Sequence, residues 1–281
     1  LFDAKMDDAL LGALGSCAVM SLISLAGAVS WAVLSLVVKD GKSSAFCVFE
    51  YACLFIAGGT MCADAFVHLL PEALEEAGDP HAVGFVAFLG AVSVVALEAF
   101  LGSFEVSVKP FGLTNLAVES LHNFIDGVAL GAAWRAGASS GLATTLAVAV
   151  HELPQELGDF AVLKRAGFRT KNLILANVAV SLTAFLGVLL AARIDRPTLL
   201  SFTAGSFAAL ALHSIAPQAL TALPDRSSAK HALVALLLAL VSGYGLVLLA
   251  ELEEDHHDHS RLSPHVRHHH HHHHSSSSSE L

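Results

Sequence analysis

The sequence predicts an all-α, polytopic membrane protein with eight transmembrane helices. Of its 281 residues, 54% are hydrophobic and only 14% are charged, whereas a soluble domain of this size carries about 25% charged residues. The apolar residues also fall into eight long runs, each sufficient for a helix to cross about 30 Å of hydrocarbon. The predicted spans are residues 9–38, 46–70, 82–101, 115–134, 141–163, 172–192, 198–220 and 231–250.

The lysine and arginine residues predict the orientation of these spans. Nine of them lie in the loops that follow spans one, three, five and seven, and six lie on the other side. The loop after span five contributes Lys164, Arg165, Arg169 and Lys171. Because basic loops are retained in the cytosol, both termini are expected on the extracytosolic side, which in an organelle is the lumen.

The chain divides into an expected eight-helix domain, 1–250, and a disordered, histidine-rich polar tail, 251–281. Two origins of the tail remain open. The run His268–His274 is typical of an expression tag, whereas His256, His257 and His259 would gather zinc in a native segment. The net charge of −10 comes without a basic stripe. Nucleic acid is therefore not an expected partner. Membrane lipid is expected as a partner because of the eight apolar spans.

Two polar motifs interrupt the predicted spans four and five. They read HNFIDG from His122 and HELPQE from His151. Ionisable side chains at membrane depth are unfavourable by at least ~2.5 kcal/mol each, so they usually mark an ion or substrate path. Three pairs of these residues are four apart, so each pair shares one helix face: His122 with Asp126, His151 with Gln155, and Glu152 with Glu156. Two such helices facing each other would present imidazole, carboxylate and amide groups, which is the chemistry of a divalent transition-metal site.

Three alternatives to a transport site follow from the same residues. A purely structural polar network is one, and a membrane metal sensor that binds without transport is another. The third is an intramembrane zinc metalloprotease, because His-Glu-x-x-His on a helix is a zinc-protease signature. Here Gln155 stands at the position of the second histidine, and Pro154 is expected to bend the helix at the site. The sequence contains no phosphate-binding loop motif, which disfavours an ATP-driven pump.

The motifs together resemble those of the ZIP (Zrt/Irt-like) family of divalent-metal transporters, over nearly all of 1–250. The segments HNFIDGVALGAAW and HELPQELGDFAVL, with DAFVHLLPEAL in span two, are most similar to the histidine-rich LIV-type subfamily and its secretory-pathway members. The resemblance implies a homodimeric secondary transporter, not an enzyme. It would move Zn²⁺, with Fe²⁺ or Mn²⁺ as alternatives, into the cytosol by alternating access. It also implies an ER or Golgi membrane, with the plasma membrane as the alternative.

The resemblance further implies a metal site between helices four and five. Its expected ligands are His122, Asn123, Asp126, His151, Glu152, Gln155 and Glu156, with Asp64, His68, Glu98 and His213 as secondary candidates along an access path. Three departures from the family pattern bear on this site. Gln155 replaces a histidine, span six offers only Thr183 and Ala184 where some relatives have a carboxylate, and Ser214 follows His213 where some have glutamate. One main site is therefore expected rather than a binuclear one.

Overall fold

The computed structural model describes residues 2–25, 29, 33, 44–105 and 107–222, without the side chains of 2–6, 44–48 and 151. Every regular element in these ranges is helical, which confirms the all-α prediction. The predicted eighth span, 231–250, and the tail, 251–281, lie outside the described residues.

Described helices lie at predicted spans two to seven, although span six is divided between α8 and α9. At span one the described helix, α1, begins at Phe2 and ends at Ile23, and most of 26–38 lies outside the described residues. They are α1 (Phe2–Ile23), α3 (Ser44–Ala63), α4 (Leu70–Ala77), α5 (Pro80–Gly102), α6 (Pro110–Ala136), α7 (Ala138–Ala166), α8 (Thr170–Ser181), α9 (Thr183–Leu190), α10 (Arg196–Ala209) and α11 (Ala216–Ala222). Three short segments join some of them: two π-helical turns, η1 (Asp64–Leu69) and η3 (Leu210–Ile215), and a 3₁₀ turn, η2 (Ala191–Arg193). Because η1 directly joins α3 to α4, and η3 joins α10 to α11, predicted spans two and seven are each helical throughout with a π turn inside.

Four of the described helical segments are long and apolar enough to cross a membrane. They are Phe49–Ala77, Pro80–Gly102, Thr170–Arg193 and Arg196–Thr221. These coincide with predicted spans two, three, six and seven. The helices at predicted spans four and five, α6 and α7, are 27 and 29 residues long and carry the polar motifs. Although Pro154 lies within α7, the helix continues through it as one element.

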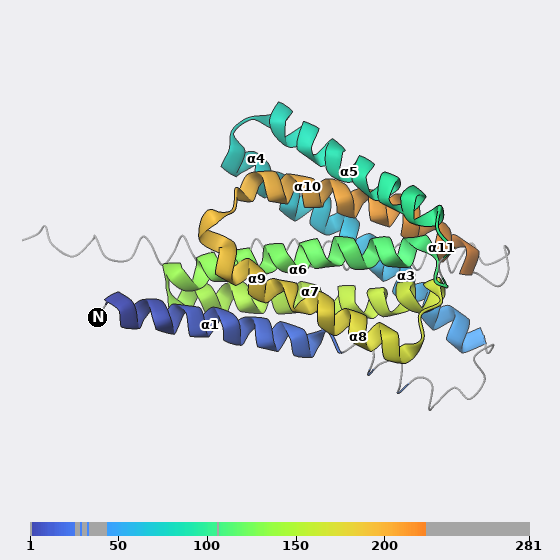
Figure 1. Ribbon diagram of the computed structural model, residues 1–281, viewed down its shortest axis with the longest axis horizontal. Helices are drawn as coiled ribbons and strands as arrows, with labels where there is room; N and C mark the ends of the chain where they lie inside the picture. The colour runs from blue at the N-terminus through green and yellow to red at the C-terminus, as the bar shows by residue number, and fades with distance from the viewer. Residues whose placement is uncertain (1, 26–28, 30–32, 34–43, 106, 223–281) are drawn as a thin grey trace, which may run out of the picture.

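The helices lie in layers with α6 at the centre. Figure 1 shows α5, α10 and α4 on one side, α6, α7 and α9 in the middle, and α1 with α8 on the other side. Within this arrangement α6 packs against α1, α5, α7 and α9, and α3 packs against α7. The sharp turns that allow antiparallel neighbours use glycines with positive φ, namely Gly78 after α4 and Gly167 after α7. Because α6 and α7 pack against neighbouring helices and most of their motif residues are buried, the two polar motifs face the interior of a helical bundle.

Glycines bring α6 and α9 into backbone contact beside the first motif. A Cβ atom added to Gly127 would collide with the backbone of Ala184, and one added to Gly187 would collide with the backbone carbonyl of Phe124. Small residues of this kind let helices approach closely in lipid, where apolar side chains alone give little association energy. The face of α6 that carries Gly127 is thus in contact with α9, while α6 also packs against α7.

Candidate metal centre

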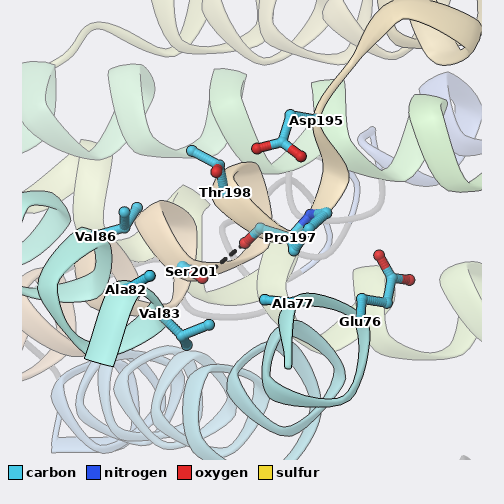
Figure 2. A pocket seen from close by; sticks show the side chains of 9 residues that line it. All are labelled: Glu76, Ala77, Ala82, Val83, Val86, Asp195, Pro197, Thr198 and Ser201. Carbon is cyan, nitrogen blue, oxygen red and sulfur yellow. Dashed lines mark hydrogen bonds between the residues drawn. The ribbon is translucent and has the colours of Figure 1, made fainter. Parts of the chain in front are cut away.

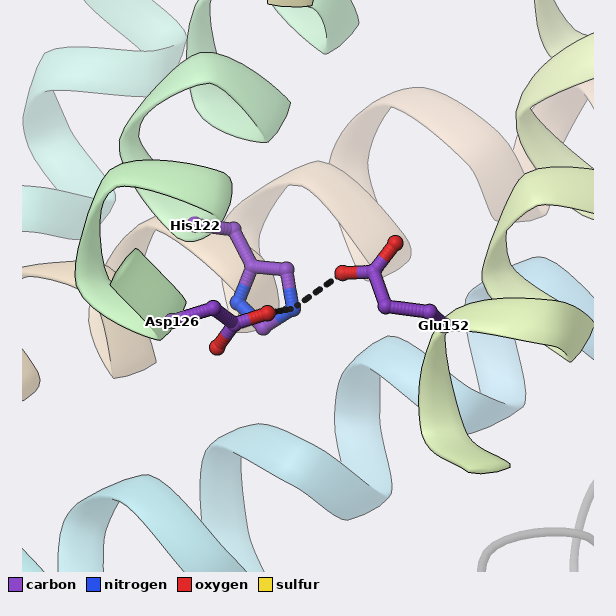
Figure 3. A group of neighbouring side chains, drawn as sticks. All are labelled: His122, Asp126 and Glu152. Atoms are coloured by element: carbon purple, nitrogen blue, oxygen red, sulfur yellow. Dashed lines mark ion pairs between the residues drawn. The ribbon is translucent and has the colours of Figure 1, made fainter. Parts of the chain in front are cut away.

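Three buried side chains of α6 and α7 point toward one another and form the candidate centre (Figure 3). His122 and Asp126 come from successive turns of α6, and Glu152 comes from α7. His122 Nε2 lies 3.5 Å from Asp126 Oδ2 and 3.4 Å from Glu152 Oε1. All three ligand atoms lie within 4.8 Å of one another. We refer to His122, Asp126 and Glu152 as the triad.

The two distances from His122 Nε2 match the distance between neighbouring ligands of zinc. Nitrogen and oxygen ligands lie about 2.1 Å from Zn²⁺, which places the corners of a tetrahedron about 3.4 Å apart. His122 Nε2 is at that distance from both carboxylate oxygens. The ring of His122 also packs on Phe207, with 4.7 Å between centroids, so the imidazole is held on its apolar face. In the described part of the chain, the triad is the one group of three or more His, Cys, Asp or Glu side chains that is this compact.

The other predicted ligands surround the triad in different ways. Asn123 is buried and donates its amide to the backbone carbonyl of Glu119 at 3.1 Å. Gln155 is buried beside Glu152 on α7, and its amide makes no hydrogen bond within the described residues. Glu156 is buried and accepts a 3.3 Å hydrogen bond from Asn177 of α8.

His151 precedes Glu152 on α7, and its side chain lies outside the described part of the chain. Its backbone belongs to the same helix.

Two of the secondary candidates connect the triad to the surface. Asp64, in the π turn η1, has Oδ2 4.0 Å from His122 Nδ1 and Oδ1 3.0 Å from His68 Nδ1. His68 Nε2 lies 3.7 Å from Glu72 Oε2, and Glu72 pairs with Arg196 at the start of α10. Because the His68 side chain is 49% exposed while Asp64 and His122 are buried, these groups form a polar arm that runs inward from the surface. The arm reaches the triad at the second nitrogen of His122.

The other two secondary candidates take different positions. Glu98, on α5, accepts a 2.5 Å hydrogen bond from Ser214 of η3. His213, the neighbour of Ser214, is exposed. Within the described residues, neither joins the triad.

A pocket of about 310 Å³ lies between α4, α5 and the beginning of α10, and Figure 2 shows it. Its polar lining includes Glu76, Asp195, Thr198 and Ser201, and the Ser201 hydroxyl donates to the carbonyl of Pro197 at 2.7 Å. None of the predicted metal ligands lines this pocket. The candidate centre is thus a set of donors enclosed between helices, separate from this open pocket.

The structure explains why span six adds no ligand to the triad. Thr183 donates its hydroxyl to the carbonyl of Ser120 at 2.8 Å, which fastens α9 to α6. Ala184 lies with its backbone against Gly127, and its methyl side chain offers no donor atom. The departures seen in the sequence therefore accompany close packing of α9 on α6.

Three buried polar residues near the triad were not predicted as site residues. Glu119 and Asn115 lie on α6, and Asp159 lies on α7. Asn115 donates Nδ2 to Asp159 Oδ1 at 2.9 Å. The signal was present in the sequence, because Glu119 precedes His122 by three residues and Asp159 follows Glu152 by seven, which places each on the face of its helix that carries the triad.

The apolar helices and the ionisable groups buried among them define the class: an α-helical integral membrane protein with a group of possible metal ligands in its interior. The family model described as ZIP zinc transporter matches residues 105–251, about half of the chain. The chain belongs to the ZIP family, a family of transporters and not of enzymes, and the resemblance seen in the motifs is confirmed.

Individual relatives are similar over about half of the chain. Human zinc transporter ZIP10 is 34% identical over 165 residues, which cover 53% of this chain and 20% of that protein. Mouse zinc transporter ZIP4 is 39% identical over 158 residues, 54% of this chain and 23% of that protein. Zinc transporter zipt-7.1 of Caenorhabditis briggsae is 34% identical over 160 residues, 52% of this chain and 41% of that protein. The chain thus matches between about a fifth and two fifths of the length of these relatives.

Proposed function

We propose that this protein carries Zn²⁺ across a membrane toward the cytosol, and that the ion binds at the triad on its way. One observation carries the proposal: three buried donor atoms, one nitrogen and two oxygens, lie within 4.8 Å of one another, and the nitrogen is 3.4–3.5 Å from each oxygen, as on the edges of a tetrahedral zinc shell. Such a donor set without thiolate binds a divalent ion selectively and still allows its release. The relatives are named zinc transporters, which supports zinc as the ion.

The proposal includes the whole architecture inferred from the sequence. It comprises eight spans in the domain 1–250, extracytosolic termini, alternating access, a homodimer and an ER or Golgi membrane, with the plasma membrane as the alternative. The four long apolar helices support a multi-span arrangement. The remaining ligands proposed around the triad are Asn123, His151, Gln155 and Glu156. Asp64 and His68 are proposed as the extracytosolic approach, since the loop after α4 follows an even-numbered span.

Zinc uptake into sealed proteoliposomes tests this function. The wild-type protein should accumulate radiolabelled zinc above empty vesicles, and His122→Ala should reduce the uptake rate at least about 100-fold, because a ligand with two carboxylate neighbours is lost. Ser206→Ala is the matched control. Ser206 is also buried, but its hydroxyl bonds only to backbone carbonyls of α5 and α10, so uptake should stay close to wild type.

The same experiment separates the alternatives. Zinc that binds to the protein but does not enter vesicles would indicate a sensor, and zinc-dependent cleavage of a membrane peptide would indicate a protease. Uptake at the wild-type rate by His122→Ala would contradict the site. Competition by Fe²⁺ and Mn²⁺ in the same vesicles tests whether zinc is the preferred ion.

A further inference from the structure

The helices α3 and α7 pack against each other between the triad and the side that we expect to face the cytosol, and we call this contact the α3–α7 seam. A Cβ atom added to Gly158 of α7 would lie 2.2 Å from Cβ and 2.8 Å from Cα of Ala57 on α3. Gly158 follows Glu152 by six residues, which is about 9 Å along α7 toward its end. At this level the close approach leaves no passage for an ion between the two helices.

The α3–α7 seam ends where three helix termini meet. The beginning of α3, the end of α7 and the whole of α11 lie at the same end of the molecule in Figure 1. Lysine and arginine residues occur in the chain next to each of these termini, at 39–42, 164–171 and 226–230. Because basic segments are retained in the cytosol, this end of the molecule is the expected cytosolic end.

Arg165, in the last turn of α7, joins the three helices at that end. Its Nη1 donates to Glu50 Oε1 of α3 at 3.3 Å, and its Nη2 donates to Thr221 Oγ1 of α11 at 2.9 Å. The guanidinium group suits this double contact because it presents several N–H donors in a fixed geometry. Glu50 precedes Ala57 by seven residues and Arg165 follows Gly158 by seven, so the ion pair lies on the α3–α7 seam about two turns beyond the close contact.

The contacts of Arg165 hold the helices without binding them tightly. The side chains of Arg165 and Glu50 are 20% and 19% exposed, so water screens part of their attraction. The Nε atom of Arg165 is buried and makes no hydrogen bond within the described residues, which reduces the net gain from the contact. An interaction of this strength biases an equilibrium between two arrangements and still allows both.

The opposite side of the triad is built differently. There the polar arm of Asp64 and His68 connects His122 to the surface, and the His68 side chain is 49% exposed. The triad thus has a polar connection toward one side of the molecule and a closed seam toward the other. Alternating access requires two states in which a central site is open to one side at a time.

We infer that Arg165, Glu50 and Thr221 form a latch that keeps the cytosolic side of the triad closed, and that these contacts separate when the ion leaves for the cytosol. This inference rests on the proposed transport function. The latch connects α7, which carries Glu152, to α3 and α11. Movement of the end of α7 away from α3 would therefore break the ion pair and open the α3–α7 seam together.

The thiol of Cys53 provides a measure of how often the α3–α7 seam opens. Cys53 lies on α3 between Glu50 and Ala57, three residues after one and four before the other, so it shares their helix face. It is 5% exposed and belongs to the same buried cluster as Ala161 of α7. Because a buried thiol reacts only in molecules that have opened locally, its labelling rate follows the population of the open state.

Labelling with a water-soluble maleimide tests the latch in the purified full-length chain. The background protein carries Cys17→Ala, Cys47→Ala and Cys62→Ala, so that Cys53 is the thiol measured. Arg165→Gln in this background should label about fivefold faster, because the closed state loses its ion pair. Arg169→Gln is the matched control, since it removes the same charge from an exposed side chain four residues away, and it should label at the background rate.

Exchange of the two charges distinguishes a latch from general loosening of the bundle. Arg165→Glu should label faster than Arg165→Gln, because it places a second carboxylate beside Glu50. Combining Arg165→Glu with Glu50→Arg restores opposite charges and should return labelling to within about twofold of the background rate. Equal rates for Arg165→Gln and the background would overturn the inference, as would fast labelling that the exchange does not reverse. If Arg165→Gln fails to fold, Glu50→Gln tests the same contact from α3.

The latch and the transport function can fail separately, because thiol labelling requires no zinc. Faster labelling of Arg165→Gln in a protein that takes up no zinc would reject transport and keep the latch as the contact that closes the seam. Zinc uptake by the wild-type protein, together with unchanged labelling of Arg165→Gln, would reject the latch alone.

Discussion

Two helix pairs in this molecule, α5–α10 and α6–α9, are joined by glycines that allow backbone to touch backbone. In α5–α10, Gly90 faces the backbone of Phe202, and Gly205 faces the backbone of Ala87. The α6–α9 pair uses Gly127 in the same manner. The pairs differ in what surrounds the contact, because the other faces of α6 carry buried polar side chains, among them His122, Asp126 and Glu119, whereas those of α5 are largely apolar.

The difference separates what a membrane requires of any helix pair from what is specific to a site. Phe85, Phe88 and Phe100 of α5 are each 61% exposed, as expected for side chains that face lipid. Close glycine packing is a general solution, since apolar side chains gain nothing by moving from lipid to a neighbouring helix. Buried carboxylates confer no such benefit on packing. In the part of the chain that the structure describes they are confined to α6, α7 and η1, which is the region that we propose to be functional.

The largest expected effect is a loss of stability when alanine replaces a glycine that lies against a neighbouring backbone, in contrast to a glycine surrounded by open space. Gly127→Ala should destabilise the protein by about 1–3 kcal/mol, because the new methyl group meets rigid backbone at Ala184. Gly205→Ala should show a similar loss in the α5–α10 pair. Gly84→Ala is the control, since open space surrounds Gly84 on α5, and it should be neutral or stabilising by up to about 1 kcal/mol. Thermal unfolding in detergent measures all three, and equal melting temperatures for Gly127→Ala and Gly84→Ala would refute the close contact.

A smaller effect is expected at Gln155, within the polar region. Imidazole is a stronger zinc donor than an amide oxygen, so Gln155→His should tighten zinc binding about tenfold and sharpen discrimination against Fe²⁺ and Mn²⁺. Slower turnover should accompany tighter binding. Competition of radiolabelled zinc uptake by iron and manganese is the measurement. Identical competition curves in the two proteins would mean that Gln155 is not a ligand.

The smallest effect tests polar groups that join helices away from the metal site. Trp134 Nε1 donates to Ser16 Oγ at 2.9 Å, and Ser16 is 2.7 Å from Thr145 Oγ1, which links α6, α1 and α7. Trp134→Phe should lower the unfolding free energy by about 0.5–1.5 kcal/mol and leave the apparent zinc affinity unchanged. Ser93→Ala, whose hydroxyl bonds only within α5, is the control and should have little effect. A change in zinc affinity for Trp134→Phe would show that this network is coupled to transport.

The fold class and the triad were predictable because both follow from local periodicity. Hydropathy located the helices, and the four-residue spacing of His122 and Asp126 put both on one face of α6. On α7 the same spacing offered two faces, that of His151 with Gln155 and that of Glu152 with Glu156, and the structure brings Glu152 to His122. The family model then supports the same motif segments independently.

What the sequence did not reveal depends on contacts between distant segments. Ala184 gives no sign in the sequence that its backbone touches Gly127, because that contact exists only once α9 packs on α6. Glu119 and Asp159 were within reach of the periodicity argument, yet Glu119 stands outside the HNFIDG motif and Asp159 is 40 residues away from it in the chain. The π turns also depend on tertiary packing, since no residue pattern in 64–69 or 210–215 requires them.

The π turn that carries Asp64 and His68 has a consequence for sequence alignment. A π turn holds one residue more than an α turn, so η1 and η3 each accommodate an additional residue inside an otherwise regular helix. If one residue is removed from η1 or η3, the π turn can become an α turn, and the backbone hydrogen bonds of the helix continue without interruption. Related sequences should therefore tolerate a single-residue gap within 64–69 or 210–215, whereas the same gap elsewhere in these spans would rotate the rest of the helix by about 100° and turn its buried face outward.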